Sequence, residues 1–68
     1  MIKMAYNVPD VKHMGDVDSD CRRLESHGAN ILKRNISWGE EEISEATIYF
    51  ECKESEITEF EDLGAWKV

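Results

Sequence analysis

Two stretches of the chain alternate apolar and polar residues with the period of two that is typical of half-buried β-strands. The first covers residues 2–8 and ends before Pro9, which cannot donate a hydrogen bond to a neighbouring strand. The second covers residues 46–53 and is the most regular. Its apolar positions are Ala46, Ile48, Phe50 and Cys52. Both stretches are predicted to lie in a sheet with one face on a core.

Residues 29–38 form a less regular strand, because their apolar side chains do not keep one parity. Ile31 lies on one parity and the later apolar residues lie on the other. We expect a β-bulge or a strong twist to reconcile them. Gly39 and the three glutamates after it form a polar turn. Residues 29–38 are therefore predicted to pair with residues 46–53 as an antiparallel hairpin, with a loop of about three to five residues.

A first helix is predicted over residues 17–27, where apolar residues recur at spacings of three and four. Its inward positions are Val17, Cys21 and Leu24. Asp16 or Asp18 is expected to cap its start, and Gly28 to end it in the left-handed conformation. A second, shorter helix is predicted between Ser55, as its N-cap, and Gly64. Its inward positions are Ile57, Phe60 and Leu63.

The last residues, 65–68, are candidates for a short final strand, so the predicted order is β-α-β-β-α(-β). This order indicates one α+β domain over residues 1–68, an antiparallel sheet with both helices packed on one face. It is the split βαβ or ferredoxin-like order. That layout carries many unrelated functions, so it indicates no activity by itself.

The length and composition exclude several classes of protein. A chain of 68 residues buries only about 60% of the surface that its unfolded form exposes. We therefore expect a stabilising partner, a homodimer or a larger complex. The sequence has no apolar run of membrane-spanning length and does not open with a signal-peptide pattern. These features predict a cytoplasmic protein with no membrane partner.

The net charge of −7 lies almost entirely in the second half of the chain. Residues 1–34 hold six basic and five acidic groups, whereas residues 35–68 hold two basic and ten acidic groups. Direct binding to nucleic acid is disfavoured, because it needs clustered Lys and Arg. Two interpretations remain: a solvated surface that keeps the protein in solution, or an acidic face that meets a basic one.

The two cysteines, Cys21 and Cys52, have no metal-binding or redox spacing. We expect both thiols to be reduced and buried as small hydrophobic groups. Both fall on core-facing positions, so a disulfide between them is the alternative. A catalytic thiolate at Cys21 is disfavoured, because no histidine is placed by spacing to act as its base.

Asp16, Asp18 and Asp20 imitate the opening of a calcium-binding loop, but Cys21 stands where that loop needs glycine and His27 where it needs glutamate. Helix capping accounts for the same aspartates. The sequence holds no phosphate-binding loop, nucleophile elbow or dinucleotide motif. We therefore predict no enzyme activity, no cofactor and no metal site.

The predicted partner-binding residues follow the strand at 46–53 and the segment after it. Tyr49, on the outer face of that strand, and Trp38, near the hairpin tip, are expected to act as apolar anchors. Glutamates beside them are expected to pair with Lys or Arg on the partner. They are Glu45, Glu51, Glu54, Glu56 and Glu59.

Carboxylates two residues apart on a strand lie about 6.6 Å apart, close to the roughly 6.8 Å of two steps along one DNA strand. The sequence therefore predicts a non-enzymatic, inhibitor-like module of the kind that phages encode, which imitates nucleic acid. Its partner is another protein with a basic surface, which such an inhibitor would occupy. The alternatives are a regulatory module that holds a small ligand at the 9–16 loop, or a structural or assembly subunit.

Overall fold

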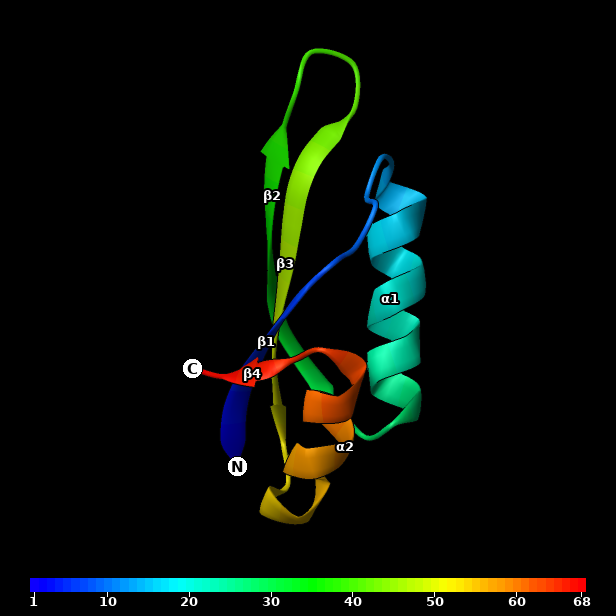
Figure 1. The fold of residues 1–68 in the computed structure, drawn as a ribbon. Helices are drawn as coiled ribbons and strands as arrows, with labels where there is room; N and C mark the ends of the chain where they lie inside the picture. Colours follow the sequence, from blue (N-terminus) through cyan, green and yellow to red (C-terminus); the bar gives the residue numbers. More distant parts are fainter.

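The computed structural model describes residues 1–68 and has the predicted mixed α+β architecture (Figure 1). Its four strands form one antiparallel sheet in the order β2-β3-β1-β4. The elements in chain order are β1 (Ile2–Asn7), α1 (Met14–Ser26), β2 (Asn30–Trp38), β3 (Ile43–Cys52), the 3₁₀-helix η1 (Glu54–Glu56), α2 (Ile57–Leu63) and β4 (Trp66–Lys67).

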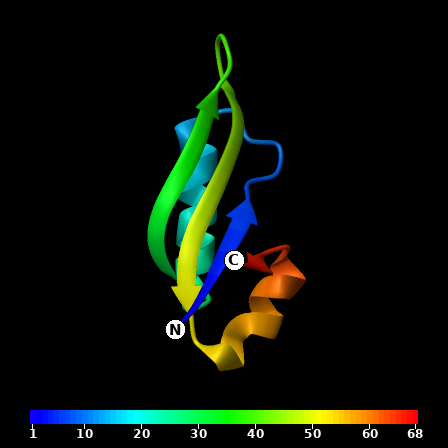
Figure 2. The same ribbon diagram turned by 90° about the vertical axis from the view of Figure 1, so that its left-hand side faces the viewer.

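Both helices lie on the same side of the sheet in Figure 1. Figure 2 looks onto the opposite side, where the strands lie in front of α1 and no helix covers them. We call the side toward the helices the inner face and the opposite side the outer face. The molecule is elongated, with extents of 40 × 20 × 19 Å, and the hairpin loop between β2 and β3 forms one end.

The core lies between the inner face and the helices. The alternating residues of β3 predicted to face inward are all buried, which confirms the pattern read from this strand. They meet Val17 and Leu24 of α1 and Phe60 of α2 in one hydrophobic cluster. The rings of Phe50 and Phe60 lie 4.9 Å apart between centroids, so a strand and a helix distant in sequence share one aromatic contact.

The expected bulge is present in β2. Ile31 pairs with Phe50 and Lys33 with Tyr49, so Leu32 is an extra residue on β2 and its side chain is 45% exposed. A second register shift separates Ser37 from Trp38 at the end of the strand. The loop covers residues 39–42, within the predicted length.

The first helix begins at Met14 and not at residue 17, so this boundary was wrong. Asp16 does not precede the helix but lies in its first turn. Its carboxylate reaches back to accept hydrogen bonds from the backbone N–H groups of Lys12 (2.9 Å) and His13 (3.1 Å). Orphan N–H groups at the helix start are satisfied in this way. The helix ends as predicted before Gly28, which has φ +105°.

The expected Ser55 cap of the second helix was also wrong. The chain turns into η1 at Glu54, and the Oε1 atom of Glu56 accepts a hydrogen bond from the backbone N–H of Lys53 (3.0 Å). This carboxylate performs the capping that was assigned to the serine hydroxyl. Gly64 ends α2 in the left-handed conformation, as predicted.

Candidate interaction surface

One row of side chains crosses all four strands on the outer face. Ala5 of β1 pairs with Tyr49 of β3 on one side and with Trp66 of β4 on the other. Lys33 of β2 pairs with Tyr49, and its Nζ atom lies 5.1 Å from the centre of the tyrosine ring. Ala5 is only 1% exposed although no helix covers this face, because larger side chains flank it in the row. Trp66 itself is 46% exposed.

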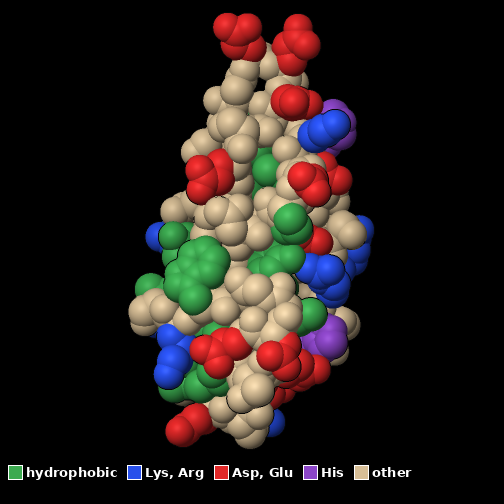
Figure 3. Space-filling view, viewed as in Figure 1, with side chains coloured by type: hydrophobic (Ala, Val, Ile, Leu, Met, Phe, Trp, Pro, Cys, Tyr) green, Lys and Arg blue, Asp and Glu red, His purple; other side chains and the backbone are tan.

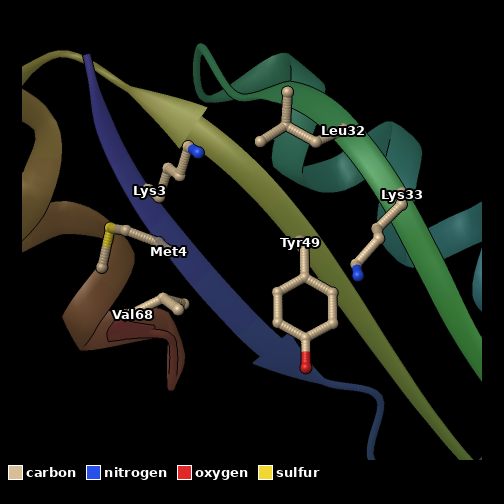
Figure 4. A pocket seen from close by; sticks show the side chains of 6 residues that line it. All are labelled: Lys3, Met4, Leu32, Lys33, Tyr49 and Val68. Carbon is tan, nitrogen blue, oxygen red and sulfur yellow. The ribbon is translucent and has the colours of Figure 1, made fainter.

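A hollow of about 400 Å³ lies beside this row. It is lined by Lys3, Met4, Leu32, Lys33, Tyr49 and Val68, which come from three strands and the C-terminus (Figure 4). Leu32 and Val68 are largely exposed on the same face. The outer face therefore carries an open region at its centre, where apolar side chains lie beside two lysines.

The two glutamates of β3 stand on either side of this centre. Glu45 and Glu51 lie on the outer face six residues apart, roughly 20 Å along the strand, with Thr47 and Tyr49 between them. The spacing of two residues that suggested imitation of DNA phosphates is therefore absent from this strand. Figure 3, which has the view of Figure 1 and so shows the outer face only along its left edge, has acidic side chains toward both ends of the molecule and hydrophobic side chains between them.

The other predicted glutamates do not lie on the outer face. Glu54 is exposed in η1. The carboxylate of Glu56 lies against Gly28, where an added Cβ would clash with its Oε2 atom. Glu59 contacts Nδ1 of His27 at 2.7 Å. Two of these acids therefore connect the α2 segment to the end of α1.

Trp38 and Tyr49 do not form one cluster. Trp38 pairs with the buried Ile43 near the hairpin loop and is 62% exposed. Along β3, Ile43 and Tyr49 are six residues apart, roughly 20 Å. The structure thus separates the two aromatic residues that were expected to anchor one contact.

Both cysteines are free and buried, as predicted. Burial raises the pKa of the Cys21 thiol and of the Cys52 thiol. The Sγ atom of Cys52 lies 3.5 Å from the sulfur of Met4 within the core. The thiols therefore act as packing groups rather than as reactive thiolates.

The aspartates of α1 have separate partners. The backbone N–H groups of His13 and Lys12 lower the pKa of Asp16. Asp18 pairs with Arg34 at 2.6 Å, and Asp20 lies 3.8 Å from Arg23. No group of three side chains is placed to hold a metal ion. The 9–16 loop, where the alternative regulatory module would hold its small ligand, lines none of the three hollows in the structure.

Several residues of the outer face were not among the predicted site residues. They reach the surface through strand register, through a bulge or at the chain end. They are Trp66, Leu32, Val68, Lys3 and Lys33. A single strand pattern does not reveal which side chains become neighbours across a sheet. The one available signal was the irregular parity of residues 29–38, which predicted the bulge but not its exposed leucine.

Neither helix of the structure is long and apolar enough to cross a membrane. Comparisons with protein-family models, with curated proteins and with solved structures found no match to this chain. No relative therefore assigns a role to any residue of the outer face.

Proposed function

We propose that this protein is a non-enzymatic binding module that docks the outer face of its sheet on a basic surface of a partner protein. The observation that carries this proposal is the uncovered row of Tyr49, Ala5 and Trp66, framed by Glu45 and Glu51. Exposed aromatic side chains at the centre of a charged rim are typical anchors of protein interfaces.

The net charge of the whole chain supports a basic partner. A net charge of −7 attracts positively charged surfaces over distance and raises the rate of encounter. The exposed glutamates of the hairpin loop, residues 40–42, extend this charge to one end of the molecule. Inhibition follows if the covered surface is one that binds nucleic acid, since the module then occupies the place of that ligand.

Two finer proposals accompany this function. The fold is proposed to be a split βαβ of ferredoxin-like order, which the sheet order β2-β3-β1-β4 supports. The protein is proposed to act in the cytoplasm, because the free thiols of Cys21 and Cys52 suit a reducing compartment.

Capture of the partner from the source cells, with identification by mass spectrometry, begins the test. The purified partner is then titrated with the natural chain and two double variants: Tyr49→Ala with Trp66→Ala, and Glu45→Lys with Glu51→Lys. The matched control, Asp10→Lys with Glu25→Lys, makes the same change of net charge at exposed positions outside the outer face.

The charge-reversed face should bind the partner more than fivefold more weakly at low salt, if each charge is worth about 0.5–1 kcal/mol. Added salt should reduce that difference, because it screens exposed charges. The control should lose much less affinity. Full binding by both outer-face variants, with loss in the control, would place the contact elsewhere on the molecule.

A homodimer is the alternative occupant of the outer face. Sedimentation of the purified chain at micromolar concentration distinguishes the two cases. A monomer that binds the partner supports the proposal. A dimer that dissociates in the variant with Tyr49→Ala and Trp66→Ala would show that a second copy covers this face.

A further inference from the structure

Two lysines border the hollow on the outer face from different strands. Lys3 comes from β1 and Lys33 from β2, and Figure 4 shows them on either side of Tyr49. Neither takes part in any of the three ion pairs of the structure. Glu51 is opposite Lys3 in the strand register, but its carboxylate makes no ion pair with it. In a chain with a net charge of −7, this one hollow therefore has two unpaired positive groups.

The other lining side chains are apolar, and a bulge and a backbone hydrogen bond position two of them. The bulge in β2 directs Leu32 to the surface. The backbone N–H of Val68 donates a hydrogen bond to the carbonyl of Lys3 (3.1 Å), which fixes the C-terminal residue beside β1. The Tyr49 ring lines the hollow together with Leu32 and Val68, and the Lys33 ammonium group lies 5.1 Å from the centre of this ring.

The size of the hollow suits a small organic molecule. Its volume of about 400 Å³ lies within the range of about 300–1,000 Å³ that is usual for small-molecule sites. A cavity of about 150 Å³ is enough to hold benzene. One ring and a charged group therefore fit here together.

We propose that this hollow binds a small organic acid, a carboxylate attached to an aromatic ring or a short apolar chain. The carboxylate pairs with the ammonium groups of Lys3 and Lys33, and the apolar part covers Tyr49, Leu32 and Val68. A neutral analogue lacks the ionic contact, and a bare anion lacks the apolar one. This site goes beyond the proposed function, since it needs no protein partner.

Titration of the ¹⁵N-labelled chain with phenylacetate, followed by two-dimensional NMR, tests the proposal. Phenylacetate should move the amide signals of residues 3, 32, 33, 49 and 68 in a saturable manner, with a Kd on the order of 1 mM. Acetate and the neutral, similarly shaped phenylacetamide should each bind at least about fivefold more weakly, because each keeps only one of the two contacts.

The double variant Lys3→Gln with Lys33→Gln should weaken phenylacetate binding about tenfold, because the loss of each exposed ionic contact should lower the affinity by about threefold. The matched control, Lys12→Gln with Lys53→Gln, changes the net charge equally at exposed positions away from the hollow and should bind normally.

Three results would each overturn the proposal. They are no saturable shift up to about 10 mM phenylacetate, equal affinity for phenylacetamide, and unchanged binding by the lysine double variant. The comparison of phenylacetate with phenylacetamide uses the natural chain, so it decides the matter even if the double variant does not fold. Capture of the protein partner is measured separately, so failure here leaves the proposed function standing.

Discussion

The two faces of β3 share one backbone, but their side chains have different surroundings. On the inner face, Ala46, Ile48, Phe50 and Cys52 are at most 1% exposed. On the outer face, Tyr49 and Glu51 are half-buried and Glu45 is exposed. Each buried large side chain contributes about 1.5–3 kcal/mol to folding, whereas the outer side chains face water or a partner. Alternate residues of this one strand thus separate the core from the face that is proposed to bind a partner.

The largest loss of stability is expected from a change at the aromatic contact of the inner face. Phe50→Ala should destabilise the fold by about 3–5 kcal/mol, because it removes a buried ring that meets Phe60 and leaves a cavity. A small domain has little more stability than this to lose. Urea denaturation followed by circular dichroism measures the change, and a loss below about 1 kcal/mol would contradict the assigned core.

Cys52→Ser probes the polarity of the same inner face. The substitution should cost about 1–3 kcal/mol, because it places a hydroxyl in the core, where the weakly accepting sulfur of Met4 is its hydrogen-bond partner. Burial raises the pKa of the Cys52 thiol above its unfolded value. Its contribution to stability should therefore persist at neutral pH and be lost in the alkaline range, as the pH rises through the raised pKa. Rapid labelling of this thiol in the native protein would refute its burial.

Changes on the outer face should be milder. Tyr49→Ala with Trp66→Ala uncovers Ala5 but opens no cavity in the core, so we expect a loss of about 1 kcal/mol or less. Thermal unfolding of this double variant beside Phe50→Ala gives the comparison directly. If the two variants lost similar stability, the outer row would belong to the fold rather than to a contact surface.

The smallest effect is expected at the start of α1, which covers the inner face. Backbone N–H groups lower the pKa of Asp16, so its contribution is present above the unfolded pKa and lost as the pH falls through the lowered value. Asp16→Asn should therefore make the free energy of unfolding depend less on pH in the acid range. The shape of the profile should change little near neutral pH. Denaturation at a series of acidic pH values checks this, and parallel profiles for both chains would contradict the assignment.

The inner face was predictable because it depends on local periodicity. The alternation over residues 46–53 and the helical spacing of Val17, Cys21 and Leu24 name the buried residues correctly. Gly28 and Gly64 end their helices at positive φ, as glycine allows. The start of α1 was missed because a carboxylate can cap a helix from within its first turn as well as from the position before it.

The outer face was only partly predictable, because it is assembled across strands. Tyr49, Glu45 and Glu51 follow from the alternation of β3 alone. Trp66 joins them through a strand of only two residues, and Leu32 through a bulge whose position depends on the β2–β3 register. Trp38 was assigned to the same contact, but a second register shift near the loop lies between it and the central row. Such neighbours depend on pairing, which periodicity does not encode.

The central claim is that the uncovered face of the sheet serves a partner and not the fold. The most direct test is the affinity of the captured partner for the folded variant with Tyr49→Ala and Trp66→Ala, measured beside the natural chain by calorimetry. The account predicts a loss of at least about tenfold, since buried aromatic anchors are commonly worth 2 kcal/mol or more. Equal affinity for the two chains, with the variant's fold intact, would contradict it.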